Sequence, residues 1–219
     1  RELDRHAIED LGIAGFDLMQ RAASAAWRVL RARWPRIARL AVLCGGGNNG
    51  GDGYLLACLA REAGLPTVVL ALAEPVTAEA KRARDAWRDA GGEIIPAEHG
   101  LPAADIYVDA IFGTGLARPV DGVEAETIRR MHATGRPVLA LDVPSGINAD
   151  TGAVLGTAVR AEITVTFIAR KRGLSTGAAL DYCGAVMLDR LGLPEESFAD
   201  AAFDARLLDS RRMATWLPP

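Results

Sequence analysis

The sequence predicts an α/β fold with a mostly parallel, doubly wound sheet and helices at its N-terminus. Two observations predict this class: short apolar segments alternate with amphipathic helical segments, and a glycine-rich loop joins one apolar segment to the next helix. The chain has 219 residues, half of them hydrophobic, so it can bury the core of one domain. We expect a single domain over residues 1–219, with residues 206–219, which end in Pro-Pro, as a linker toward a further domain.

The elements follow from hydrophobic periodicity. Apolar positions at helical spacing predict one helix near Leu3 to Leu11 and a second between Leu18 and Leu30, which ends at Trp34-Pro35. Short apolar runs predict strands at 39–44, 67–72, 93–95, 105–109, 137–142, 161–167 and 185–189. Amphipathic spacing predicts further helices at 52–63, 77–90 and 122–133.

The loop after the first expected strand carries the densest cluster of glycines in the chain, over residues 45–53. Its Gly45-x-Gly47-x-x-Gly50 spacing fits a dinucleotide fingerprint, with Glu74 located about 20 residues further on. It also begins like a phosphate-binding P-loop, but Asp52 stands where that motif has lysine. Backbone N–H groups and the helix dipole favour an anion here. Asp52 either contributes to a site or caps the helix.

Two more strand ends carry unusual chemistry, in residues 107–119 and 139–148. Asp109 and Asp142 each close an apolar run, and the carboxyl ends of parallel strands meet at one edge of a sheet. Taken singly, an aspartate in such a position is more often a turn former or a cap than a catalytic group. Beside the glycine-rich loop, the two together predict a ligand site. The basic residues 170–172 either help hold phosphates or form a solvated loop.

Composition excludes several classes. A net charge of −3 disfavours non-specific nucleic-acid binding, and no apolar run reaches the ~18 residues of a membrane span. The three cysteines form no C-x-x-C pair, which favours free buried thiols and a reducing compartment such as the cytoplasm. The histidines lie outside the three loops and Ser145 lies outside a Gly-x-Ser-x-Gly motif, so neither a catalytic triad nor a zinc site is predicted.

The three loops resemble those of the NAD(P)H-hydrate epimerase family, the YjeF N-terminal domain, in order and approximate spacing. The N-terminal segment 1–13 and Lys171-Arg172-Gly173-Leu174 are similar to that family as well. The resemblance implies a Rossmann-like three-layer αβα fold, often dimeric, and repair of NADH and NADPH hydrated at C6 of the nicotinamide. Many family members are fused to an ADP- or ATP-dependent hydrate dehydratase domain.

The resemblance also implies a set of site residues. The nucleotide would contact Asn48, Asn49, Gly50, Gly51, Asp52, Gly113, Thr114, Gly115, Leu116, Ala117, Arg118, Pro119 and Asp142. Potassium would be bound by Asn49, Asp109 and Ser145, and oxygen ligands suit a hard cation.

The reacting carbon is a hemiaminal centre, so its inversion needs proton transfer at the hydroxyl oxygen. A carboxyl group within hydrogen-bond reach can supply this, and Asp142 is our candidate for the catalytic residue. No hydride moves, so no separate redox cofactor is needed. Two other interpretations stay open: a non-catalytic nucleotide-binding or scaffold module, and a nucleotide-dependent oxidoreductase.

Overall fold

A computed structural model describes residues 2–198, 205 and 207. Its seven strands form one sheet in the order β3-β2-β1-β4-β5-β6-β7, and every neighbouring pair is parallel. The strands are β1 (Leu40–Cys44), β2 (Thr67–Ala71), β3 (Glu93–Pro96), β4 (Ile106–Ala110), β5 (Val138–Leu141), β6 (Ile163–Phe167) and β7 (Ala185–Asp189). All seven expected strands are therefore confirmed, and the sheet is parallel throughout the described part of the chain.

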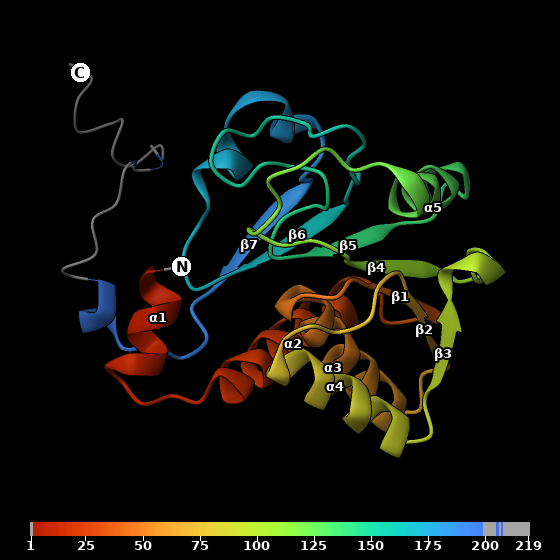
Figure 1. Ribbon diagram of the computed structural model, residues 1–219, viewed down its shortest axis with the longest axis horizontal. Coiled ribbons are helices and arrows are strands. Elements are labelled where there is room, and N and C mark those ends of the chain that lie inside the picture. The colour runs from red at the N-terminus through yellow and green to blue at the C-terminus, as the bar shows by residue number, and fades with distance from the viewer. Residues whose placement is uncertain (1, 199–204, 206, 208–219) are drawn as a thin grey trace.

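Helices cover both faces of this sheet and give the three layers visible in Figure 1. On one face lie α2 (Gly15–Arg33), α3 (Asn48–Glu62) and α4 (Ala78–Asp89), and on the other lies α5 (Gly122–Ala133). A short helix, α1 (Glu2–Glu9), precedes them, and the short 3-10 helices η1 (Ala97–His99), η2 (Arg172–Ser175), η3 (Gly177–Asp181) and η4 (Glu195–Phe198) lie in connections. The predicted three-layer αβα class is confirmed. No described helix is long and apolar enough to cross a membrane.

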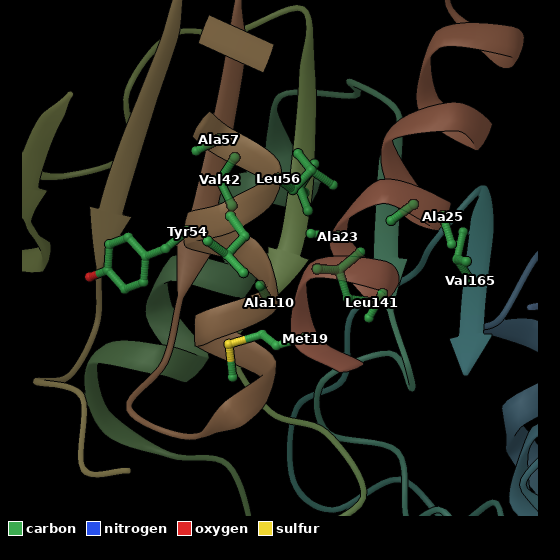
Figure 2. Packing of buried hydrophobic residues seen from close by; sticks show 14 of the residues in the cluster. Met19, Ala23, Ala25, Val42, Tyr54, Leu56, Ala57, Ala110, Leu141 and Val165 are labelled. Carbon is green, nitrogen blue, oxygen red and sulfur yellow. The ribbon is translucent and has the colours of Figure 1, made fainter. Parts of the chain in front are cut away.

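The largest buried cluster lies between the sheet and α2 and α3, where side chains such as Leu56 of α3 and Val42 of β1 meet (Figure 2). The strand β1 is buried at all five positions because helices cover both of its faces. A second cluster, which includes Ile128 and Met131 of α5, fills the opposite face.

The point where the strand order reverses lies between β1 and β4. The chain runs outward from β1 to β2 and β3, then returns to β4 on the other side of β1. In doubly wound sheets, ligands bind at this point, outside the carboxyl ends of the strands. The glycine-rich loop follows β1 and Asp109 lies in β4, so the fold places both at the reversal.

Two boundaries differ from expectation and both bear on the site. The helix α3 begins at Asn48, four residues earlier than predicted, so residues 48–51 are helical and not part of a loop. The strand β5 ends at Leu141, and Asp142 has a φ of 64°. Apart from residue 207, the expected linker at 206–219 lies outside the described residues.

Candidate nucleotide site at the carboxyl edge of the sheet

The glycines between β1 and α3 allow the helix to approach the strand ends closely. A Cβ atom on Gly50 would lie 1.9 Å from the carbonyl oxygen of Gly45, and one on Gly45 would lie 2.0 Å from the carbonyl oxygen of Ile111. Neither position can hold a side chain without moving backbone. Gly47 differs, because a Cβ there would meet no atom within 4 Å. The loop is therefore tightly packed on one side and open at Gly47.

The open position is also the N-cap of α3. Gly47 has an extended backbone and no side chain to accept from the first-turn N–H groups. These groups and the helix dipole make this end suitable for an anion. Asp52 is the fifth residue of α3, so its interpretation as the helix cap is wrong. Its negative charge adds to burial in raising the pKa of the Cys44 thiol.

Asn48 joins the N-termini of two helices. Its side chain is exposed, and its Oδ1 accepts a hydrogen bond of 2.6 Å from Thr77 Oγ1. Thr77 in turn caps α4 by accepting from the Ala80 N–H at 3.2 Å. The contact leaves Asn48 at the surface of the open edge, close to the start of α3.

A buried polar cluster lies behind this edge and joins the start of α3 to the carboxyl ends of β4 and β5. Asp109 accepts three hydrogen bonds: from Ser145 Oγ at 2.6 Å, from the Ser145 N–H at 2.8 Å and from the Ile111 N–H at 3.2 Å. The Phe112 N–H donates to Ser145 Oγ at 2.8 Å, and Asn49 Nδ2 donates to the Phe112 carbonyl at 3.1 Å. The structure therefore brings together the three residues that the resemblance assigned to a cation.

Two features of this cluster fit a hard cation. Asp109 is fully buried, and burial raises its pKa to about 6 although the bonds from Ser145 and Ile111 act against this. Asn49 Oδ1 is a buried acceptor without a hydrogen-bond partner among the described residues. A buried acceptor lacking a donor is costly unless something else satisfies it. A carboxylate, an amide oxygen and a hydroxyl are the donor types that a hard cation takes.

Asp142 faces the same edge from the end of β5. Its left-handed backbone is uncommon outside glycine but tolerated by aspartate, and its N–H donates to the Val165 carbonyl at 2.7 Å. Its Oδ1 accepts from Lys171 Nζ, and its Oδ2 would lie 3.5 Å from a Cβ built on Gly113. The carboxyl group therefore lies between Lys171 and the start of the loop 113–119.

The loop 113–119 is mostly exposed. Its turn contains a backbone hydrogen bond of 3.4 Å from the Leu116 N–H to the Gly113 carbonyl. Arg118 stacks over the Phe112 ring at 5.7 Å and forms ion pairs of 3.6 and 3.7 Å with Asp121 and Glu124. Its guanidinium is therefore directed toward the start of α5 in this structure.

Other sequence candidates lie apart from this edge or are occupied. Glu74, considered as the acidic residue of a dinucleotide fingerprint, forms an ion pair of 2.8 Å with Arg84. Arg170 and Arg172 donate to backbone carbonyls of Val186 and Asp150. Of the three basic residues at 170–172, Lys171 alone contacts a candidate site residue. The sequence did not predict the ion pair between Lys171 and Asp142. The signal that could have indicated it is a lysine shortly after the apolar strand 163–167.

Two hollows in the described part of the chain lie away from this edge. One, of about 500 Å³, is an open groove between α2 and the end of β7, and the other, of about 320 Å³, lies beside η1 and the start of α5. Neither is lined by Asp109, Asp142 or the start of α3. We assign the site from its chemistry and its place at the reversal of strand order, because fixed polar groups converge there.

The fold and the site define an α/β protein with a glycine-rich strand–helix connection and with one buried and one partly buried carboxyl group at the carboxyl edge of its sheet. The chain belongs to the family described as YjeF-related protein N-terminus, which matches residues 15–173. The crystal structure of a yeast protein superposes with a TM-score of 0.77 over 93% of each chain at 19% identity, which supports the fold.

Curated relatives are of two lengths. The bifunctional NAD(P)H-hydrate repair enzyme Nnr of Coxiella burnetii is 45% identical over all of this chain, which spans 45% of that enzyme. The NAD(P)H-hydrate epimerase of Limosilactobacillus fermentum is 40% identical over 86% of this chain and 91% of its own length. The chain therefore spans less than half of the bifunctional relative and nearly all of the shorter one.

Proposed function

We propose that this chain epimerises the C6 hydroxyl of hydrated NADH and NADPH, interconverting the R and S forms as a step of metabolite repair. The observation that carries the proposal is the placement of Asp142, whose carboxyl group lies at the end of β5, one strand from the reversal, with one oxygen toward Gly113. Two relatives that align with this chain over most of both lengths are named NAD(P)H-hydrate epimerase, which supports the same reaction.

The nucleotide fits the edge in one general arrangement. Its pyrophosphate lies near the N-terminus of α3, where Gly47 leaves open space and the first-turn N–H groups attract an anion. In this proposed arrangement, residues 48–52 and 113–119 flank the pyrophosphate from two sides, and the nicotinamide end of the nucleotide lies near Asp142. The arrangement uses the tight packing of Gly45 and Gly50, because only that packing brings the helix terminus to the strand ends.

The chemistry required is proton transfer at one oxygen. The hydroxyl leaves as water after protonation and gives an iminium, or the C6–N1 bond opens and closes; both routes allow return on the other face. Asp142 supplies the proton in one direction and accepts it in the other. As a carboxylate, it also stabilises the positive charge that develops on the ring. No electron pair leaves the system as hydride, so the reaction is an isomerisation.

Potassium is the cation that we propose for the buried cluster. Asn49 Oδ1, the Asp109 carboxylate and Ser145 Oγ would hold it, which fits the unsatisfied amide oxygen and the buried carboxyl group. Its charge would offset that of Asp109, and its ligands would connect the start of α3 to the ends of β4 and β5. The cluster lies behind the Asp142 edge, so we assign the cation a structural role and leave proton transfer to Asp142.

The wider setting of the reaction is also a proposal. The substrate is a small molecule, NAD(P)HX. The family resemblance implies a homodimer, and the free cysteines favour a reducing compartment such as the cytoplasm. We also propose fusion to an ADP- or ATP-dependent NAD(P)H-hydrate dehydratase domain, as the family resemblance implies; relatives named bifunctional repair enzymes support a second domain.

The decisive experiment compares two carboxamide substitutions. Asp142→Asn keeps the shape of the side chain and removes the proton-transfer group, so a folded variant should bind nucleotide and epimerise at least about 100-fold more slowly. Asp52→Asn should mainly weaken nucleotide binding. Rates are measured by chromatographic separation of the epimers, after subtraction of spontaneous epimerisation. If Asp142→Asn turns over normally while Asp52→Asn binds but does not react, the roles are reversed. A parent protein that binds without epimerising would instead be a nucleotide-binding module.

A further inference from the structure

The ammonium group of Lys171 is fully engaged inside the protein. It donates to the Phe167 carbonyl at 2.8 Å, to Thr166 Oγ1 at 3.1 Å and to Asp142 Oδ1. A lysine ammonium has three protons, and three acceptors use all of them. The side chains of Lys171 and Asp142 are only 19% and 16% exposed, so water screens this ion pair less than a surface pair.

This arrangement argues against a phosphate clamp. A lysine that binds a substrate phosphate needs protons directed to the ligand, whereas those of Lys171 are directed to the end of β6 and to Asp142. Its two arginine neighbours are exposed and donate to backbone carbonyls of other loops. Within the basic segment, Lys171 is therefore distinguished by its contact with a carboxyl group at the reaction edge.

The same contact makes the two oxygens of Asp142 inequivalent. Oδ1 accepts from Lys171 and lies 3.4 Å from Thr166 Oγ1, which is itself completely buried. Oδ2 is directed the other way, toward Gly113 at the start of the flanking loop. A carboxylate rotating freely about its terminal bond would present either oxygen. Here one oxygen is held and the other is left for a ligand.

The backbone adds a second constraint. Asp142 has a left-handed conformation, which is unfavourable for most residues with a Cβ atom, and its N–H bond to the Val165 carbonyl on the neighbouring strand holds it there. The main chain and the ion pair thus restrict the carboxyl group from both ends. Orientation of this kind matters because a misplacement of about 1 Å at a reacting group can cost about 100-fold in rate.

We propose that Lys171 is a positioning residue of this reaction: it binds Asp142 Oδ1 and thereby presents Oδ2 as the atom that exchanges a proton with the substrate hydroxyl. The inference rests on the proposed epimerase function. Lys171 contacts neither the substrate phosphates nor the reacting carbon, and it acts through Asp142. Its loss therefore lowers kcat while leaving KM nearly unchanged.

The test combines four variants with one control. Lys171→Met keeps the length of the side chain without charge or protons, and we expect kcat to fall about 10- to 100-fold with KM changed by less than about threefold. Lys171→Arg keeps the charge, but its planar guanidinium cannot reach the same three acceptors, so an intermediate loss is expected. Arg170→Met, in the adjacent exposed position, should retain parent kinetics.

The double variant Asp142→Asn/Lys171→Met separates positioning from a general structural effect. If Lys171 acts only through Asp142, the double variant is no slower than Asp142→Asn alone. Addition of propylammonium should partly restore a Lys171→Ala variant, because it matches the atoms that this truncation removes, whereas tetramethylammonium, which has no N–H group, should not. Thermal melting of each variant checks the fold, and Lys171→Arg carries the test if Lys171→Met does not fold.

Three outcomes would overturn the inference. Parent kcat in a folded Lys171→Met variant would show that the ion pair is dispensable. A raised KM with unchanged kcat would make Lys171 a substrate-binding group. Additive losses in the double variant would mean that Lys171 acts independently of Asp142. Each of these requires an active parent protein, whereas a parent without epimerase activity would refute the proposed function and with it the inference.

Discussion

Potassium should stabilise this protein strongly at neutral pH and only weakly at acidic pH. The reason is the buried Asp109 carboxyl group, whose pKa is raised to about 6 from an ordinary value of 3.8. That difference of about 2 pH units corresponds to about 3 kcal/mol. Because Asp109 is completely buried, solvent does not reduce this figure in the way it does for a surface group.

The direction of the effect follows from linkage. A carboxyl group whose pKa is higher in the folded than in the unfolded protein holds its proton more tightly when folded. Its contribution to stability is fully present below pH 3.8 and is lost as the pH rises through about 6. A cation that binds the ionised form offsets this loss. At pH 5, only about a tenth of Asp109 would be ionised without the cation, so the apparent affinity for potassium should be about tenfold weaker than at pH 7.

The assay is thermal melting in potassium chloride and in tetramethylammonium chloride at matched ionic strength, at pH 5 and pH 7.5. A full recovery of about 3 kcal/mol at pH 7.5 would raise Tm by about 6–12 °C in a protein of this size. Asp109→Asn should abolish the difference between the two salts. Asp121→Asn, which removes an exposed carboxylate just before α5, should preserve the difference in melting between the two salts.

Two results would refute this reasoning. Equal melting in both salts at pH 7.5 would mean that the cluster binds no potassium. A potassium effect of the same size at pH 5 and pH 7.5, or one that survives Asp109→Asn, would place the cation away from the buried carboxyl group.

Two further predictions concern the glycine-rich connection and the core. Gly47→Ala should fold, because its Cβ meets no atom within 4 Å, but it should weaken nucleotide binding measured by calorimetry. Gly50→Ala should fail to fold or should melt at a far lower temperature, because its Cβ would lie 1.9 Å from the Gly45 carbonyl oxygen. The reverse order would contradict the assignment of Gly47 to the ligand side. Leu56→Ala should reduce the free energy of unfolding by about 2–5 kcal/mol in denaturant titration, since Leu56 is fully buried in α3. Leu180→Ala, at a site 67% exposed, should stay within about 0.5 kcal/mol, and equal losses would contradict the core described for Leu56.

Local pattern was sufficient for the central strands of the sheet because they are buried on both faces. Runs such as Leu40–Cys44 and Ile106–Ala110 are apolar at nearly every position, and alternation with helices of ordinary length permits parallel pairing. The start of α3 was misplaced for the opposite reason. Residues 48–51 are two asparagines and two glycines, which have low intrinsic helix propensity. They are helical because Gly50 packs on Gly45 and Gly51 packs on Met19, contacts that only the assembled layers supply.

The site divides in the same way. The sequence alone indicated which strand ends carry carboxyl groups and that glycines allow close approach of backbone, since both depend on residues adjacent in the chain. The tertiary structure decided how those groups are paired: Asp109 with Ser145 across 36 positions, and Asp142 with Lys171 across 29. Such pairings depend on the order of strands in the sheet and on the direction of each side chain at a strand end. The left-handed backbone of Asp142 sets the direction of its side chain, and a local sequence pattern does not predict that backbone conformation.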